Sequence, residues 1–141
     1  MQVVTRNNKK EPLRFDKITD RIKGFTSDLS DIIDPTNITQ QIVSQITDGI
    51  NTRDLDELSC LVCLQQTTKH PDYGKLAARI AINNHHKDTC GNFKEFVDNA
   101  YINKDVLGNN APLVSEEIKE ITDEHYETIQ EWIDYDRDYN L

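Results

Sequence analysis

The sequence predicts an α+β protein that is mostly helical, a four-helix bundle capped by a small β-hairpin or sheet and followed by further helices. Two observations predict this class. Near the start, two short runs of β-type residues flank the pair Asn7-Asn8, and asparagine tolerates the positive φ of a hairpin turn. Four later segments carry apolar residues at helical spacing, with connections short enough for antiparallel neighbours.

The predicted hairpin pairs residues 2–5 with residues 12–15. Pro12 has no N–H to donate, so it suits only an edge position. A two-stranded hairpin is marginal by itself, and we therefore expect helices to pack beneath it. Asp16 is the expected N-cap of the first helix, whose buried face consists of Ile18, Ile22 and Phe25.

The second and third helices each have a recognisable start. Asp34 followed by Pro35 combines a capping residue with a first-turn proline. The second helix is expected to break near Gly49, and its apolar positions are Ile38, Ile42, Ile46 and Ile50. Thr52 is the expected cap of the third helix, whose inward-facing residues are Leu55, Leu58, Leu61 and Val62.

The fourth helix is the predicted centre of the core. Pro71 suits its first position because the missing N–H would be unpaired there anyway, and Asp72 places negative charge in the first turn. Its apolar stripe consists of Tyr73, Leu76, Ala77, Ile80, Ala81 and Ile82. The helix ends in His85, His86 and Lys87, which can reach a surface site.

The apolar pattern is looser after residue 93. A short helix is expected around Phe93, Phe96, Val97 and Tyr101. A loop at residues 108–112 then precedes two further helices, at residues 114–121 and 125–133. Residues 134–141 end without a terminal cap, which we interpret as a cut within a longer polypeptide.

The composition is that of a globular protein. A chain of 141 residues is long enough for one domain with a single core. The first ten residues lack the apolar run of a signal peptide, and no apolar stretch reaches the roughly 18 residues that a membrane-spanning helix needs. We therefore expect a soluble, cytoplasmic protein without a membrane partner.

The net charge of −9 argues against a general nucleic-acid binder, but the charge is unevenly distributed. Residues 1–25 hold seven basic side chains against three acidic ones, whereas residues 116–141 hold ten acidic against two basic. The basic end could attract a phosphate ligand. The alternative is a solvated surface with a chance asymmetry.

Cys60, Cys63 and Cys90 are an odd number of cysteines, which favours free thiols in a reducing compartment. Cys60 and Cys63 form a CxxC motif, but it lies within the apolar run LSCLVCL, where cysteine behaves as a small hydrophobe. The other potential ligands have no recognised zinc spacing. We therefore expect no metal site.

Basic residues near helix starts are the groups that a triphosphate requires, because cationic side chains act together with unpaired helical N–H donors. The phosphate candidates are Arg6, Lys9, Lys17 and Lys87, and Glu11, Thr52 and Asp56 could contact a ribose or a base. The chain has neither a GxxxxGK[ST] nor a GxGxxG motif. From these residues alone, solvated lysines and an Asp56 paired with a neighbour remain the alternative.

Three sequence blocks carry a family resemblance: an opening VVTR followed by KEPLRFDKITDRI, a central TTKHPDY with LAARIA and HK, and a final IDYDRDYN. In this order they resemble the N-terminal ATP-cone and adjoining helical segment of class I ribonucleoside-diphosphate reductase large subunits. The resemblance implies an ATP-cone over residues 1–90. Residues 91–141 would be a helical lead-in to a catalytic barrel that is absent from this chain.

In the family, the cone binds ATP or dATP, with Mg²⁺, between the β cap and the four helices. ATP favours the active enzyme and dATP favours inhibited oligomers, so the site is allosteric. The resemblance implies the rest of the large subunit, a small radical-generating subunit and further copies of the chain as partners. The implied nucleotide-binding residues are Thr5, Arg6, Lys9, Glu11, Pro12, Leu13, Arg14, Phe15, Asp16, Lys17, Thr52, Asp56 and Lys87.

Two departures from the family concern the opening turn. Many members have Lys where this chain has Thr5, and Gly where it has Asn8. Losing one cation should weaken phosphate binding by about 1–2 kcal/mol. The radical cysteine and redox pairs of the family's reductases have no counterparts here, so we expect no catalytic residues in this segment. The rival interpretations are a free-standing ATP-cone regulator, such as a repressor of reductase genes, and a non-functional fragment.

Overall fold

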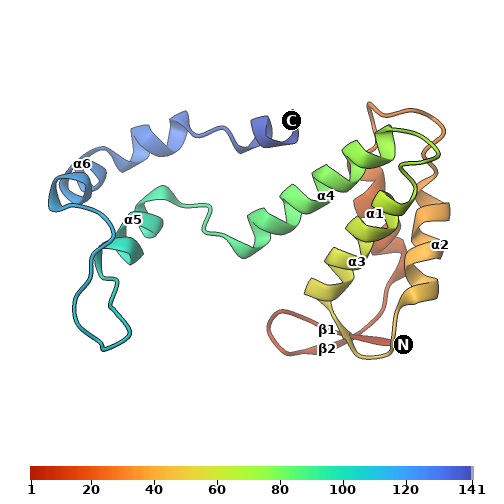
Figure 1. Ribbon diagram of the computed structural model, residues 1–141, viewed down its shortest axis with the longest axis horizontal. Coiled ribbons are helices and arrows are strands. Elements are labelled where there is room, and N and C mark those ends of the chain that lie inside the picture. Colours follow the sequence, from red (N-terminus) through yellow and green to blue (C-terminus); the bar gives the residue numbers. More distant parts are fainter. Residues whose placement is uncertain (141) are drawn as a thin grey trace. The chain divides into compact units, whose positions relative to one another are not determined.

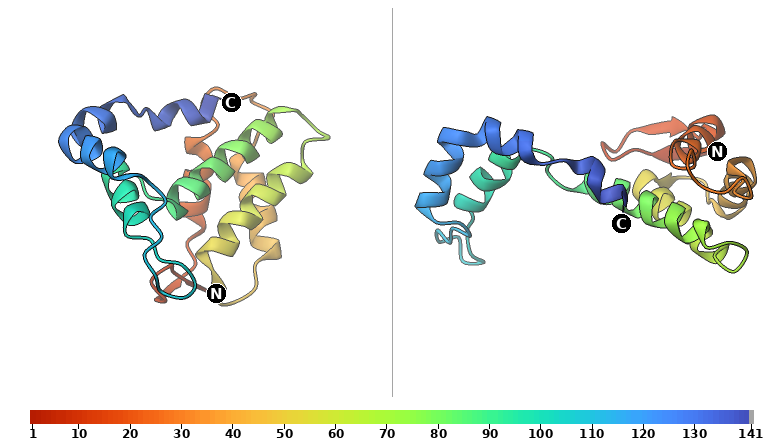
Figure 2. Two further views of the ribbon diagram at one scale, coloured as in Figure 1. Left: turned by 60° about the vertical axis from the view of Figure 1, so that its left-hand side comes forward. Right: turned by 90° about the horizontal axis from the view of Figure 1, so that it is seen from above.

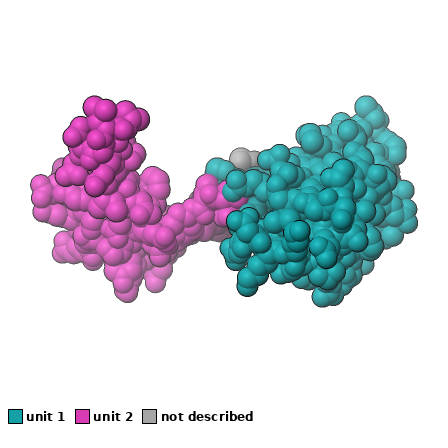
Figure 3. All heavy atoms as spheres, turned by 90° about the horizontal axis from the view of Figure 1, so that it is seen from below, with its two compact units in different colours: residues 1–85 teal, residues 86–141 magenta. Residues whose placement is uncertain are grey.

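The computed structural model describes residues 1–140 and divides the chain into two compact units, residues 1–85 and 86–141 (Figure 3). The division falls within one helix, α4 (Asp72–Asp88). The predicted class is confirmed, because the structure is mostly helical with one small sheet.

The sheet of the first unit has three strands in the order β2-β1-β3. Strand β1 (Gln2–Val4) pairs antiparallel with β2 (Lys10–Pro12) and parallel with β3 (Ile50–Asn51). Pro12 lies on an edge strand, as predicted. The third strand is one that the sequence analysis did not predict, because Ile50 was assigned to the second helix.

The hairpin turn sets the register of the first two strands. Asn8 has a positive φ of 58° and its N–H donates to the carbonyl of Thr5, while the N–H of Thr5 donates to the carbonyl of Lys9. The turn therefore closes at Lys9, and Lys10 lies opposite Val4. The predicted second strand at residues 12–15 is wrong in position, since pairing ends at Pro12 and a helix begins at residue 15.

Helix α1 (Phe15–Gly24) is preceded by Arg14, which makes no side-chain cap. The prediction of Asp16 as N-cap is wrong. Asp16 lies within the first turn, where its carboxylate accepts a 2.5 Å hydrogen bond from Arg14. Its negative charge there interacts favourably with the positive end of the helix dipole. Ile22 is buried as predicted, and Ile18 packs partly buried against the core.

Helix α2 (Pro35–Gln45) begins as predicted, with the Asp34 carboxylate accepting a 2.8 Å hydrogen bond from the Thr36 N–H. It ends at Gln45, so the prediction that Ile50 belongs to it is wrong. Gly49 has φ 84° and donates its N–H to the carbonyl of Gln2, which directs the chain alongside β1.

Helix α3 (Thr52–Gln65) is capped by Asn51, whose side chain accepts a 2.9 Å hydrogen bond from the Asp54 N–H. The prediction of Thr52 as the cap is therefore wrong by one residue. Leu61, predicted to face inward, is 54% exposed. Leu61 falls on the side of the helix opposite the buried residues, which are Leu55, Asp56, Ser59, Val62 and Cys63.

Helix α4 follows Pro71 directly. Figures 1 and 2 show the four helices of the first unit side by side, with the sheet near one end. Ala81 is exposed, contrary to the predicted stripe. One core joins all four helices and the sheet, and its members include Val3, Ile22, Ile38, Ile42, Leu55, Val62, Cys63, Tyr73, Leu76, Ala77 and Ile80.

Arg79 of α4 fixes the segment that follows α1. Its Nη1 donates to the Phe25 carbonyl at 2.8 Å and to Asp28 at 2.6 Å, and its Nη2 donates to the second Asp28 oxygen at 2.8 Å. The hydrogen bonds from Arg79 to the Asp28 carboxylate lower the pKa of Asp28 from 3.8 to about 2. The Asp28 carboxylate therefore contributes stability above its unfolded pKa and loses it as the pH falls towards the folded value.

We expect an Asp28→Asn variant to be less sensitive to acid than the wild type. The wild type should lose more stability between about pH 4 and pH 2. Its Asp28 carboxylate takes up a proton on unfolding in that range, whereas the asparagine of the variant cannot. Urea unfolding midpoints at the two pH values measure the difference. Asp31→Asn, at an exposed aspartate, is the matched control. Equal acid sensitivity of wild type and Asp28→Asn would contradict the assignment.

The second unit contains α5 (Phe93–Tyr101), α6 (Glu116–Trp132) and the 3₁₀ helix η1 (Tyr135–Asn140). The prediction of two helices at 114–121 and 125–133 is confirmed in part, because α6 consists of two helical stretches that meet at a kink at His125, where φ is −123° and ψ is 15°. The helical turn η1 was not predicted, and Leu141 lies outside the described residues. Among residues 1–140, no helix has both the length and the apolar character that crossing a membrane requires.

Candidate functional site

A buried carboxylate stands at the centre of the candidate site. Asp56 lies one turn into α3 and is only 6% exposed. Its Oδ2 accepts a 3.2 Å hydrogen bond from Nη2 of Arg6, and its Oδ1 accepts a short one from Nη1 of Arg21. A buried carboxylate is stable only when cations or N–H donors compensate its charge, and here two guanidinium groups do so.

Arg21 extends the site to α4. Its Nη2 donates to the side-chain oxygens of Asn83, at 3.0 Å, and Asn84, at 2.5 Å. Its Nε is buried and has no hydrogen-bond partner among the residues that the structure describes. Arg6, Arg21, Asp56, Asn83 and Asn84 are called the Asp56 cluster below.

The sequence analysis identified only Arg6 and Asp56 of this cluster. Arg21 could have been found from one signal, because it follows the phosphate candidate Lys17 by four residues and so lies on the same side of α1. Asn83 and Asn84 follow the apolar stripe of α4 and carry no further signal. Their role depends on the approach of α1 to α4.

The opening turn holds two of the predicted residues together. Thr5 accepts a 3.1 Å hydrogen bond at Oγ1 from the Lys9 N–H. Glu11 and Pro12 are exposed on the edge strand, and Leu13 packs partly buried against the core. Lys9 and Glu11 are therefore exposed to solvent, whereas Thr5 and Leu13 are half-buried.

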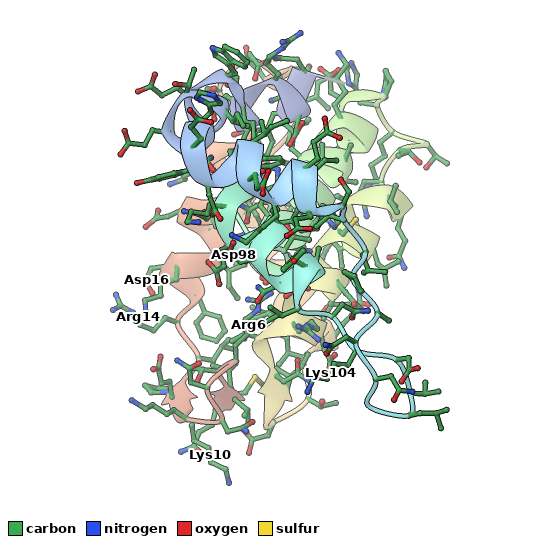
Figure 4. All side chains as sticks on the ribbon, turned by 90° about the vertical axis from the view of Figure 1, so that its left-hand side faces the viewer. Arg6, Lys10, Arg14, Asp16, Asp98 and Lys104 are labelled. Carbon is green, nitrogen blue, oxygen red and sulfur yellow. The ribbon has the colours of Figure 1, made fainter. Side chains whose placement is uncertain are left out.

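The start of α1 presents four of the predicted residues at the surface: Arg14, Phe15, Asp16 and Lys17. Figure 4 shows Arg14 and Asp16 beside one another, and their hydrogen bond lowers the pKa of Asp16 and raises that of Arg14. Phe15 is 49% exposed. Among residues 1–140, the ammonium group of Lys17 forms no ion pair with an acidic side chain.

The last two predicted residues lie on different units. Thr52 is the first residue of α3 and precedes Asp56 by four residues, so both lie on one side of that helix. Lys87 is exposed near the end of α4, within the second unit. Of the predicted residues, Arg6 thus contacts Asp56, and Arg14 contacts Asp16. The phosphate roles of Lys17 and Lys87 stay predictions.

The cysteines are free thiols, as predicted. Burial raises the pKa of Cys63 to about 12 and raises that of Cys60, so both are protonated near neutral pH and poorly nucleophilic. Within the described residues, no group of three or more His, Cys, Asp or Glu side chains is arranged to hold a metal ion.

Comparison with known proteins identifies the class of domain to which residues 1–88 belong. The family model of the ATP cone domain matches residues 1–88. The chain therefore belongs to the ATP-cone family, as the sequence resemblance predicted.

Relatives extend the similarity over nearly the whole chain. It is 42% identical to "Ribonucleoside-diphosphate reductase large chain 2" of Saccharomyces cerevisiae, over 99% of this chain and 16% of the relative. The large subunit of Dictyostelium discoideum is 42% identical, and that of Plasmodium falciparum 37%, each over 99% of this chain and 17% of the relative. The chain thus spans about one sixth of the length of these relatives.

Proposed function

We propose that this chain is the allosteric ATP- or dATP-binding segment of a ribonucleoside-diphosphate reductase large subunit. The match to the ATP cone domain over residues 1–88 supports nucleotide binding, and the reductase relatives support the setting. The whole enzyme would make deoxyribonucleotides from ribonucleoside diphosphates, and this segment would regulate it without catalytic residues of its own.

The Asp56 cluster is the observation that supports an anionic ligand most directly. Arg6, Arg21 and Asp56 together carry one net positive charge, and the Arg21 Nε is a buried donor without an acceptor among residues 1–140. A triphosphate provides many acceptor oxygens and compensating negative charge. Arg6, Lys9, Lys17 and Lys87 would bind its phosphates.

Other predicted residues would bind the rest of the nucleotide. Glu11 and the backbone around it would contact the adenine, and Thr52 and Asp56 the sugar. Leu13 and Phe15 offer apolar surface near the same strand and helix start. Mg²⁺ would accompany the phosphates and reduce their charge repulsion.

The proposed domain arrangement follows from the same family membership. Residues 1–90 would form the ATP-cone, with α1–α4 as its four-helix bundle and the sheet as its cap. Residues 91–141 would form the lead-in to the catalytic barrel. The rest of the large subunit, a small radical-generating subunit and further copies of the chain would be its partners, and nucleotide binding would change their assembly.

Calorimetric titration of the full chain with ATP and dATP in the presence of Mg²⁺ tests the proposal. We expect Lys17→Ala to weaken ATP binding by about tenfold, because it removes one charge-assisted contact to phosphate. Lys69→Ala removes the same charge from an exposed position after α3 and should leave the affinity unchanged. No binding by the wild type would overturn the proposed function, and equal affinity of Lys17→Ala and wild type would remove Lys17 from the site.

A further inference from the structure

We propose that Arg21 is a positioning residue of the nucleotide site, and that it holds Asp56 so that Arg6 can leave the carboxylate and bind a triphosphate. This inference rests on the proposed function, because it concerns how the same site takes up its ligand. Arg21 itself need not contact the phosphates.

The two oxygens of the Asp56 carboxylate are bound by two different arginines. Arg6 contacts Oδ2 and Arg21 contacts Oδ1, so each guanidinium uses a different carboxylate oxygen. The Asp56 side chain is 8% exposed, and a carboxylate so buried is unfavourable without a nearby cation. With Arg21 in place, Asp56 keeps one cation when Arg6 turns away.

The two arginines differ in the elements that hold them and in their exposure. Arg21 comes from α1, contacts Asp56 on α3, and donates to Asn83 and Asn84 on α4, so three helices fix it. Arg6 follows β1 in the hairpin turn, and its side chain is 32% exposed against 24% for Arg21. Arg6 is therefore the arginine that can exchange partners.

The exchange has a consequence for phosphate binding. Without Arg21, the charges of Arg6 and Asp56 cancel within that pair, and Asp56 competes with the phosphates for Arg6. Removing the charge of Asp56 should end that competition. We therefore expect Asp56→Asn to restore the phosphate affinity that Arg21→Gln removes. A loss of structure in Arg21→Gln would not be reversed in this way.

Inorganic tripolyphosphate, which has no sugar or base, is the probe for this test. Calorimetric titration of the full chain compares wild type, Arg21→Gln, Asp56→Asn and the double variant. We expect Arg21→Gln to weaken tripolyphosphate binding by about tenfold or more, on the scale of one charge-assisted contact. The double variant should return to within about threefold of wild type.

Arg6→Gln provides the reference for direct loss of a phosphate ligand, and Asp56→Asn should not rescue it. Unchanged binding in Arg21→Gln, or a double variant no better than Arg21→Gln, would overturn the positioning role while leaving nucleotide binding intact. If the wild type binds neither tripolyphosphate nor ATP, both the inference and the proposed function are wrong.

Arg21→Lys keeps the inference testable if Arg21→Gln does not fold. Lysine retains a cation beside Asp56 but cannot contact Asp56 and both asparagines at once. We expect its tripolyphosphate affinity to stay within about threefold of wild type. A loss as large as that of Arg6→Gln would show that Arg21 binds phosphate itself and would overturn the positioning role.

Discussion

Leu76→Ala should lower the free energy of unfolding of the first unit by about 2–5 kcal/mol. Leu76 lies on α4 with 0% of its surface exposed, inside the core that joins α1, α2, α3 and α4. Truncation would remove its buried methyl groups and leave a cavity that close-packed neighbours fill only in part. The measurement is amide hydrogen exchange of α4 in the full chain at increasing urea.

Leu61→Ala is the matched control, because it removes the same atoms from a leucine that is 54% exposed. Its effect should stay below about 1 kcal/mol. Fluorescence of Trp132, the only tryptophan, reports on the second unit and should not change in either variant. Equal losses for Leu61→Ala and Leu76→Ala would contradict the assignment of α3 and α4 faces.

Asp56→Ala should destabilise the first unit by about 3 kcal/mol, although it removes a polar residue from the interior. The reason is the pair of guanidinium groups, since Arg21 would lose its carboxylate, while its Nε already lacks a partner within the part of the chain that the structure describes. A buried ion pair broken on one side leaves an uncompensated charge behind. Urea unfolding followed by hydrogen exchange of α3 measures the change.

Glu57→Ala is the control for Asp56→Ala. It removes an acid from the next position of α3, where the side chain is exposed, and should change stability by less than about 0.5 kcal/mol. A smaller effect of Asp56→Ala than of Glu57→Ala would show that the Asp56 cluster does not stabilise the fold.

Most of the fold could be predicted because its signals are local. Asp34 and Pro35 start α2 as predicted, since capping depends on neighbours within one turn. Helical spacing likewise predicted the burial of Leu76 and Ile80. The errors are of a different kind: Ile50 looks like the next apolar position of α2, and only its pairing with Val3 places it in a strand.

The candidate site could be predicted only in part, for a related reason. Arg6 and Asp56 were identified as separate candidates, first from their residue types and then through the family resemblance, but their contact spans fifty positions of the chain. Arg21 was not among the candidates, because its contacts with Asp56 and Asn83 form only where α1, α3 and α4 pack together.

The sequence by itself determined the helices, the hairpin turn at Asn8 and the family to which the chain belongs, because caps, periodicity and motifs are properties of short segments. Only the tertiary structure decided that β3 joins the sheet and that a second arginine shares the buried carboxylate of Asp56. Burial is the physical reason: a charge withdrawn from water must find its partner among whichever residues the packing brings near, however distant they are along the chain.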